Sequence, residues 1–343
     1  MKPSRDQLLS LLATLGSKRA VGRALLKDEK QIRRWCIEYS ITDTKENSRV
    51  IIENLREEIG NLSYRKIRSK PIVEVKGETL VITLSDWHVG KEIRDEHNNI
   101  IFNESILVKR INDRLFPEIL SLLDTRIKKS TKINDVVILC VGDMADGSDI
   151  FPTQIYQQYV APPRQVMLCV ELIIPFIESL VDRGLPVTFY GVRGNHGRGL
   201  KLENPESNWD IMLYLILQYV VQQKKLKNVV VNFSDLEYMN LKIRGWNYHI
   251  RHIAPEQDDT SGGRVKFLGW KDMHKYDVIV YGHYHHFGIT DIYGARRIRN
   301  GCVSGWDDLS EKMAKMADPV QVIHGCASKR AMSFIYPVDL KGE

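Results

Sequence analysis

Clusters of aspartate, asparagine and histidine recur along the chain, each directly after a short apolar, β-branched run. Such runs predict strands, and polar side chains at the carboxyl ends of strands in an α/β sheet converge on one ligand site. The clusters are Asp86-Trp87-His88, Gly142-Asp143-Met144-Ala145-Asp146, Arg193-Gly194-Asn195-His196, the single His252, and Gly282-His283-Tyr284-His285-His286. The pattern therefore predicts one site assembled from separate segments of the chain.

The side chains in these clusters offer nitrogen and oxygen ligands without thiolate, which suits divalent ions such as Mn²⁺, Fe²⁺, Zn²⁺ or Ni²⁺. The candidate ligands are too many for one tetrahedral ion and suit two ions that share a carboxylate. They are Asp86, His88, Asp143, Asn195, His252, His283 and His285. Asp-x-His and His-x-His place alternate residues on the same side of a strand end. Gly142, Gly194 and Gly282 would let the backbone turn sharply beside the ions.

Two histidines compete for the fourth cluster. His249 and His252 are three positions apart, so they face opposite sides of a regular strand. We favour His252 because it directly precedes the loop sequence IAPEQDDTSGG, and the other candidates also lie where strands enter loops. His97, His274 and His324 are expected to be structural, hydrogen-bonded residues.

In this order the motifs resemble those of the calcineurin-like metallophosphoesterases, in particular the phage-type members. The matching elements are D-x-H, G-D-x-x-D, G-N-H, a later single His and G-H-x-H, over residues 78–290. The resemblance implies an α/β fold in which two mixed β-sheets are sandwiched between helices. It also implies a dinuclear-metal phosphoesterase that uses in-line attack of a metal-bridging hydroxide on phosphorus.

The resemblance further implies roles for individual residues. The ligands would divide between two ions, with Asp86, His88 and His285 on one, Asn195, His252 and His283 on the other, and Asp143 between them. Mn²⁺ is the favoured ion, with Fe²⁺, Zn²⁺, Ni²⁺ and Mg²⁺ as alternatives. His196, acting with Asp143 and Asn195, would stabilise the developing charge or protonate the leaving oxygen.

The chain departs from the family pattern at one position. Members usually carry an acidic residue directly after G-N-H, where this chain has Gly197. That acid commonly orients the neighbouring histidine, so Asp146 is the candidate replacement, the alternative being that it only caps a helix. Arg193 and Arg198 are candidates for contacting the substrate phosphate, against the alternative that both are solvated.

Positive charge is concentrated at the N-terminal end of the 343-residue chain. Residues 1–70 contain 16 Lys+Arg and 9 Asp+Glu, whereas the remaining residues contain 33 Lys+Arg and 34 Asp+Glu. A basic segment before a near-neutral one predicts a polyanionic partner, and we favour nucleic acid over a merely solvated helical face.

Three short helices are predicted before residue 42, over residues 6–15, from Ser17 to about 26, and after an Asp28 N-cap. The third would carry Lys30, Gln31, Arg33 and Arg34 on one side, and Ile32, Trp35 and Cys36 on the other. This arrangement resembles a helix-turn-helix, whose third helix enters the DNA major groove. A small helical docking module is the alternative.

The chain is thus expected to comprise a basic helix-turn-helix-like module over residues 1–42, a helical linker over 43–70, and a metallophosphoesterase domain over 71–343. Beyond Pro71, apolar strand-like runs alternate with amphipathic helices near 103–129 and 164–183, and consecutive late strands predict an antiparallel portion. No run approaches the roughly 20 apolar residues that span a bilayer. Five scattered cysteines without CxxC favour a reducing cytoplasm, bacterial or phage-infected.

Three functions remain open at this stage. The first is a DNA or RNA nuclease, for which nucleic acid, DNA above all, would be the partner. The second is a phosphomonoesterase that acts on nucleic-acid ends or on another substrate. The third is a DNA-binding assembly protein with a vestigial metal site, which the intact ligand set disfavours. No membrane partner is expected, and a homo-oligomer is compatible with the sequence.

Overall fold

The computed structural model describes residues 2–15, 18–41, 77–128, 133–148, 150, 154, 157–198, 204–255, 261–306 and 317–342. The chain forms two compact units, Met1–Lys70 and Pro71–Glu343. The helix expected over residues 43–70 lies outside the described residues, and so does Ser17, the expected N-cap of the second helix.

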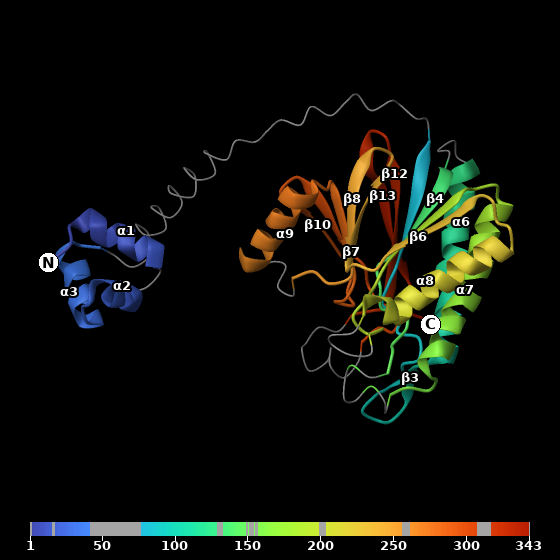
Figure 1. Cartoon of the computed structure of the whole chain (residues 1–343), viewed down its shortest axis with the longest axis horizontal. Coiled ribbons are helices and arrows are strands. Elements are labelled where there is room, and N and C mark those ends of the chain that lie inside the picture. Colours follow the sequence, from blue (N-terminus) through green and yellow to red (C-terminus); the bar gives the residue numbers. More distant parts are fainter. Residues whose placement is uncertain are drawn as a thin grey trace. The chain divides into compact units, whose positions relative to one another are not determined.

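The smaller unit contains three short helices, as predicted (Figure 1). They are α1 (Arg5–Leu15), α2 (Lys18–Leu25) and α3 (Glu29–Glu38). Asp28 is the N-cap of α3, because its Oδ1 accepts a hydrogen bond from the Gln31 backbone N–H at 2.6 Å. The apolar side of α3, with Ile32 and Trp35, is buried against α1 and α2 residues such as Leu8 and Val21.

The larger unit contains two mixed sheets and a two-stranded ribbon. The first sheet, in the order β13-β12-β1-β4-β5-β6, comprises β1 (Glu78–Leu84), β4 (Ile133–Cys140), β5 (Val187–Val192), β6 (Val229–Ser234), β12 (Val320–Ala327) and β13 (Arg330–Asp339). The second, in the order β10-β11-β9-β8-β7, comprises β7 (Tyr238–Ile243), β8 (Trp246–Arg251), β9 (Val278–Tyr281), β10 (Gly288–Ile292) and β11 (Ala295–Arg299). The ribbon pairs β2 (Ile93–Arg94) with β3 (Ile100–Phe102).

Parallel pairing dominates the centre of both sheets. Strands β1, β4, β5 and β6 are parallel neighbours, whereas β12 and β13 join them antiparallel. In the second sheet β8, β9 and β11 are parallel, and β7 and β10 are antiparallel edges. Because parallel strands end at the same edge, the polar clusters that follow β1, β4 and β5 begin side by side.

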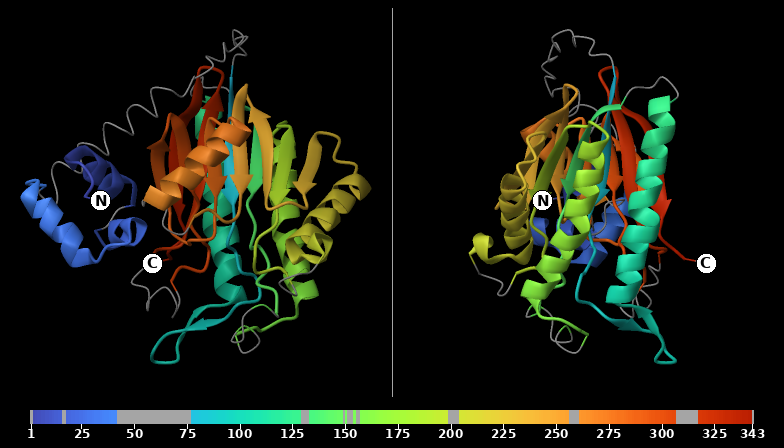
Figure 2. Two further views of the ribbon diagram at one scale, coloured as in Figure 1. Left: turned by 60° about the vertical axis from the view of Figure 1, so that its left-hand side comes forward. Right: turned by 90° about the vertical axis from the view of Figure 1, so that its right-hand side faces the viewer.

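Helices cover the outer faces of the two sheets (Figures 1 and 2). The first sheet is covered by α6, α7 and α8, and the second by α9. Their bounds, with those of the shorter helices, are α5 (Glu104–Lys109), the π-helix η1 (Arg110–Leu115), α6 (Phe116–Lys128), α7 (Pro162–Asp182), the 3₁₀-helix η3 (Pro205–Ser207), α8 (Trp209–Gln223) and α9 (Ser261–His274). The helices predicted near 103–129 and 164–183 are confirmed, the first with a π-helical segment between α5 and α6.

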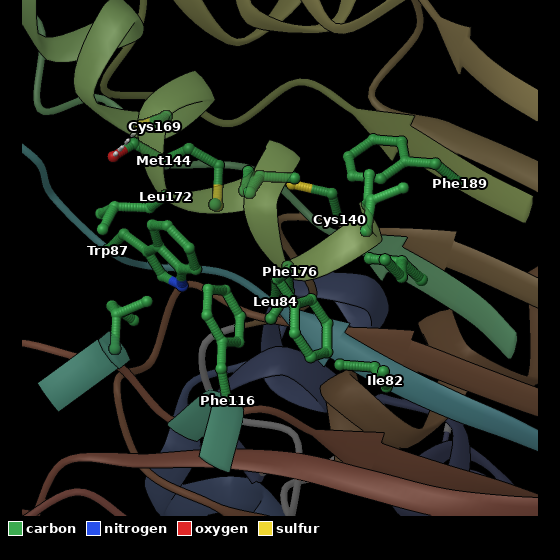
Figure 3. Packing of buried hydrophobic residues seen from close by; sticks show 14 of the residues in the cluster. Ile82, Leu84, Trp87, Phe116, Cys140, Met144, Cys169, Leu172, Phe176 and Phe189 are labelled. Carbon is green, nitrogen blue, oxygen red and sulfur yellow. Dashed lines mark hydrogen bonds between the residues drawn. The ribbon is translucent and has the colours of Figure 1, made fainter. Parts of the chain in front are cut away.

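Alternation along β1 divides its side chains between two cores. Ile82 and Leu84 face the helices and pack in the cluster that includes Trp87 and Phe116 (Figure 3). Trp87 is fully buried, and its ring centroid lies 6.3 Å from that of Phe116, so it points into packing as expected. Val81 faces the other way, into the core between the two sheets.

The second sheet is also apolar on both faces. Tyr248 and Val280 pack toward the first sheet, whereas Ile279 and Tyr281 pack with Phe267 of α9. The larger unit therefore has four layers, helices, sheet, sheet and helix, which confirms the predicted sandwich of two mixed sheets between helices. Over the described residues, no helix has both the length and the apolar character needed to cross a membrane.

His324 on β12 makes the stability of this sandwich depend on pH. Its side chain is fully buried, and its Nε2 lies 3.0 Å from the Tyr248 hydroxyl, which itself donates to the Ala331 carbonyl. Burial lowers the pKa of His324 to about 3, against about 6.5 in an unfolded chain. The unfolded state therefore binds more protons below pH 6.5, and the stability from this group is lost as pH falls from about 6.5 toward 3.

We expect the larger unit to lose about 2 kcal/mol through His324 alone between pH 7 and pH 5. A His324→Gln variant, which keeps a donor near Tyr248, should start less stable at pH 7 and lose correspondingly less on acidification. Urea unfolding of both proteins at the two pH values, with EDTA throughout, measures the difference. Equal losses in the two proteins would contradict the assignment.

Candidate metal centre

The seven predicted ligands meet at one place, although they follow five different strands. Three groups of side chains have ligand atoms within 4.8 Å of one another: Asp86, His88 and His285; His88, Asp143 and His196; and Asp143, His252 and His283. Asn195 joins the third group, because its Oδ1 lies 3.1 Å from His252 Nε2. Asp143 belongs to two of the three groups, which is the position that a bridging carboxylate requires.

The backbone at these ligands is unusual. Five of them have positive φ angles, namely Asp86 (53°), His88 (47°), Asp143 (54°), His283 (75°) and His285 (60°). L-residues other than glycine rarely adopt this left-handed region, and its cost is tolerated mainly where function demands it. The prediction that strand geometry places the residues of Asp-x-His and His-x-His on one side of a strand end is therefore wrong. Strand β1 ends at Leu84 and β9 at Tyr281, so the ligands lie in turns beyond the strands.

Two glycines permit close approach around the carboxylates. Gly142 has a φ of 91°, and a Cβ there would lie 2.5 Å from the Gly194 backbone nitrogen. At Gly282 a Cβ would lie 2.4 Å from Asp86 Oδ2. The loop that carries Asp143 thus packs directly on the loop that carries Asn195, and the loop that carries His283 packs on Asp86. The sequence predicted sharp turns at these glycines but not this packing.

The contacts of His252 suit a cation site. Its Nδ1 donates to the Val141 carbonyl at 2.7 Å, so Nε2 is the ring atom that faces the Asn195 oxygen and Asp143 Oδ2, the latter at 2.8 Å. Without a metal, a proton on Nε2 pairs with Asp143, and the same three atoms would ligate a cation in place of that proton. In the protein alone, burial lowers the pKa of His252, but attraction to Asp143 outweighs burial and raises this pKa to about 9.

His88 repeats the same arrangement on the other side of Asp143. Its Nδ1 donates to Asp146 at 3.0 Å, so its Nε2 lone pair faces His285 Nε2, also at 3.0 Å. His285 Nε2 in turn lies 3.6 Å from Asp86 Oδ1. An outer hydrogen bond that orients a ligating imidazole is the usual arrangement at protein metal sites.

Both carboxylates of the centre are buried close together. Burial, together with the neighbouring Asp143, raises the pKa of Asp86 to about 7 against the opposing effect of His252. Burial also raises the pKa of Asp143, but the positive charges of His252 and His196 outweigh burial and hold it well below its usual range. Two buried carboxylates surrounded by imidazoles, which can give up a proton to a metal, fit a pair of divalent cations.

Asp146 orients His196. We predicted this role for Asp146 from the sequence, because the chain has Gly197 where family members usually carry the orienting acid. The His196 Nδ1 donates to Asp146 Oδ1 at 3.1 Å, the same oxygen that His88 contacts. Burial lowers the pKa of His196, but Asp143 and Asp146 outweigh it and raise this pKa above its ordinary value. Asp146 is 2% exposed, its Oδ1 contacts both histidines, and it caps none of the helices in the described part of the chain.

Asp210 is a residue of the site that sequence reasoning missed. Its carboxylate, fully buried at the start of α8, accepts backbone N–H bonds from Asp143 at 2.9 Å, Met144 at 3.0 Å and Gly194 at 2.8 Å. It therefore ties the G-D-x-x-D loop to the G-N-H loop. Burial raises the pKa of Asp210 to about 6, with a further contribution from Asp143.

The start of α8 also occupies the space beside Gly197. A Cβ at Gly197 would lie 2.8 Å from Asn208 Oδ1. Asn208 is the N-cap of α8, where its Oδ1 accepts from the Asp210 N–H at 2.9 Å and its Nδ2 donates to the Gly194 carbonyl at 3.1 Å. The sequence signal, Asn-x-Asp before an apolar run, predicts a helix start but not these contacts.

The remaining histidines lie outside the ligand groups. His249 Nδ1 contacts Asn240 Oδ1 of β7 at 2.7 Å, and its ring stacks on His274 of α9 at 4.6 Å between centroids. The structure thus places His252 at the centre and His249 in packing. His286 contacts the Tyr284 carbonyl through Nδ1 at 2.7 Å.

The two arginines expected near phosphate lie beside the centre. Arg193 and Arg198 line one small pocket together with Asn195 and His252. Arg193 Nη2 also lies 3.8 Å from Glu237 Oε1. The pocket opens next to the ligands of the Asn195 side of the centre.

The residues expected to contact DNA lie in the smaller unit. On α3, Lys30, Arg33 and Arg34 are exposed and Gln31 is half-buried. Arg33 pairs with Glu29 one turn earlier, at 2.7 Å.

Comparison with known proteins identifies the family. Residues 79–287, more than half of the chain, match the sequence model of the calcineurin-like phosphoesterase family. The protein belongs to this family, whose members are dinuclear metal-dependent phosphoesterases. The fold and the converging ligand groups agree with that membership. No curated protein matches the sequence.

Several solved structures are similar in fold at low sequence identity. An archaeal phosphodiesterase is 12% identical, with 76% of this chain and 99% of that chain covered and a TM-score of 0.34. Vps29 of Cryptosporidium parvum is 16% identical, with coverage of 76% and 97% and a TM-score of 0.35. Vps29 of Entamoeba histolytica, solved with zinc, is 13% identical, with coverage of 76% and 99% and a TM-score of 0.33.

Asp210→Asn should weaken metal binding although Asp210 is not itself a predicted ligand. The amide cannot accept the three backbone N–H bonds as a carboxylate does, so the loops that carry Asp143 and Asn195 lose their common anchor. We expect Mn²⁺ affinity to fall about 10–100-fold, the usual range for outer residues of metal sites. Calorimetric titration of the metal-free protein measures it, with the exposed Asp182→Asn as control. Unchanged affinity would remove Asp210 from the site.

Proposed function

We propose that this protein is a two-metal phosphodiesterase that cleaves nucleic acid, with Mn²⁺ as its metal. The observation that supports the proposal most directly is the convergence of two groups of ligands on either side of Asp143. Their division agrees with the roles implied by the family motifs. A DNA-binding role of the smaller unit, in the manner of phage-type proteins, is part of the same proposal.

The metals would supply Lewis-acid activation of the nucleophile and neutralisation of charge on the phosphoryl oxygens. His196 then provides the proton for the leaving oxygen. Asp146 holds the imidazole through Nδ1, which directs the opposite ring nitrogen away from this carboxylate. The raised pKa of His196 keeps it protonated to higher pH, as a general acid requires.

Nucleic acid is favoured as substrate by the charge of the smaller unit. The exposed side of α3 carries Lys30, Arg33 and Arg34, and the opposite side is buried. The α2–α3 turn, over residues 26–28, has the length of a helix-turn-helix connection. Such a unit would hold DNA through phosphate contacts while the larger unit supplies the chemistry.

Phosphomonoester hydrolysis is the second candidate, because it would use the same ions and the same general acid. A vestigial centre in a DNA-binding assembly protein is less well supported, since all seven ligands are present and adjacent. A reducing compartment such as the cytoplasm fits the five free, buried cysteines. A bacterial or phage-infected cell is proposed only from the resemblance to phage-type members.

Three substrates distinguish these functions for the Mn²⁺-loaded full chain. We expect hydrolysis of bis-p-nitrophenyl phosphate and of labelled DNA, and a much slower reaction with p-nitrophenyl phosphate, because the proposed substrate is a diester. Absorbance and gel assays measure the rates. Preference for the monoester would establish the second candidate, and inactivity on all three with intact metal binding would favour the vestigial centre.

His196→Ala is the variant that checks the mechanism within this assay. It should retain both ions and lose about 10²–10⁴-fold in rate on DNA, the scale of general acid–base catalysis. The loss should be smaller on nitrophenyl esters, whose leaving group needs little protonation. Equal losses would assign His196 to charge stabilisation or positioning.

Charge reversal on α3 tests the role of the smaller unit in the full chain. Lys30→Glu/Arg34→Glu should weaken duplex DNA binding and flatten its salt dependence, since each lost phosphate contact removes close to one counterion from the slope. Fluorescence anisotropy at two salt concentrations measures both. Lys225→Glu/Lys227→Glu, on exposed positions of the larger unit, is the control with the same change in net charge. Equal effects of the two pairs would contradict DNA binding by α3.

A further inference from the structure

A small pocket adjoins the metal centre and contains two arginines. The pocket is lined by Arg193, Gly194, Asn195, Arg198, Glu237, His252 and Ile253. Asn195 and His252 belong both to this pocket and to the predicted ligands, so a group bound in the pocket lies immediately beside a group bound at the metals. The pocket has a volume of about 20 Å³, so a second part of the substrate enters only as far as its oxygen atoms unless the side chains that line the pocket move.

The hydrogen-bonding state of the arginines indicates a missing anionic partner. The Nε atoms of Arg193 and Arg198 are buried and have no hydrogen-bond acceptor among the described residues. Arg193 is 21% exposed, and its ion pair with Glu237 is long, at 3.8 Å. A buried donor without an acceptor costs free energy, which an incoming acceptor recovers.

The chemistry of the two arginine side chains favours phosphate over other hydrogen-bond acceptors as the group bound in the pocket. Guanidinium groups are planar, permanently charged and arranged to donate two parallel hydrogen bonds to phosphate or carboxylate. Two of them in one pocket favour an anion with several oxygens. A diester in a nucleic-acid strand has such an anion on either side of the scissile phosphate, whereas a nitrophenyl ester has none.

We infer that Arg193 and Arg198 bind the non-reacting phosphate adjacent to the scissile phosphate of a nucleic-acid strand. This inference rests on the proposed function and specifies its substrate, because it requires at least two consecutive phosphates. Glu237 lies at the same pocket, and its carboxylate competes with the substrate for Arg193. Removing Glu237 should therefore strengthen binding of the adjacent phosphate.

Trinucleotides with one neutral linkage test the inference directly. The substrates are thymidine trinucleotide with two phosphodiesters and its two isomers in which one linkage is an uncharged methylphosphonate. For the wild-type protein, we expect kcat/KM to fall about 10–100-fold for both isomers, because each keeps only one charged linkage and leaves no adjacent phosphate for the pocket; this is the scale of lost charge-assisted hydrogen bonds. Arg193→Gln and Arg198→Gln should lower kcat/KM on the all-phosphate substrate similarly, and the neutral linkage should then have little further effect.

Bis-p-nitrophenyl phosphate and Arg183→Gln are the controls. The nitrophenyl diester has no second phosphate for the pocket, so the pocket variants should lose much less activity on it than on the trinucleotide; circular dichroism and Mn²⁺ titration of the variants show that the fold and the metal centre are intact. Arg183 pairs with Asp124 on the helical face and should behave as wild type. Equal losses of the pocket variants on the trinucleotide and on the nitrophenyl diester would overturn the inference.

Glu237→Gln separates phosphate binding from a structural ion pair. If Arg193 served only to pair with Glu237, this variant would reproduce the losses of Arg193→Gln, and the inference would be wrong. We expect the opposite sign, a higher affinity for the trinucleotide. The readout is anisotropy of fluorescein-labelled trinucleotide with the full chain in EDTA, which needs no turnover.

The binding experiment also distinguishes failure of the inference from failure of the proposed function. Absence of diester hydrolysis by the wild-type protein would refute the function, while weaker trinucleotide binding by Arg193→Gln than by Arg183→Gln would still support the pocket. Hydrolysis with no effect of either arginine on binding or on kcat/KM would refute the pocket and leave the function standing.

Discussion

The centre of this protein is organised by the need to keep two buried carboxylates close together. Asp86 and Asp143 follow the parallel neighbours β1 and β4, and both are at most 1% exposed. Buried like charges repel strongly at low dielectric, so the arrangement requires compensating positive charge and firm positioning. The left-handed backbone at the ligands, the glycines packed against them and the ring of imidazoles around them all serve this requirement.

Positioning is achieved mainly by hydrogen bonds outside the ligand groups. Val141 and Asp146 accept hydrogen bonds from Nδ1 of His252 and His88, so that Nε2 of each ring faces the centre. Asp146 also orients His196, so one carboxylate oxygen links His88 to His196. Asp210 anchors the loops of Asp143 and Gly194 through backbone N–H groups. The geometry of the centre thus depends on carboxylates that are not ligands.

The departure from the family pattern at Gly197 has a physical explanation in these contacts. Asn208 occupies the space that a side chain at this position would need. The orienting carboxylate for His196 comes from Asp146, and the carboxylate that anchors the loops comes from Asp210. The site requires negative charge at given positions in space. Part of that charge comes from the start of α8, twelve residues after Gly197, and not from a residue next to His196.

Local sequence determined the strands, the helices and the types of ligand, because alternation, capping and strand-end clusters reflect short-range geometry. The sandwich of two mixed sheets was predicted from the resemblance of the motifs to a known family. Parallel β1, β4 and β5 then bring their clusters to one edge without further information. Only the tertiary structure decided between His252 and His249, gave Asp146 its two partners, revealed Asp210 and placed Arg193 with Arg198. These contacts join residues as much as 111 positions apart, as between His252 and Val141. They depend on how sheets and loops pack, which no local pattern encodes.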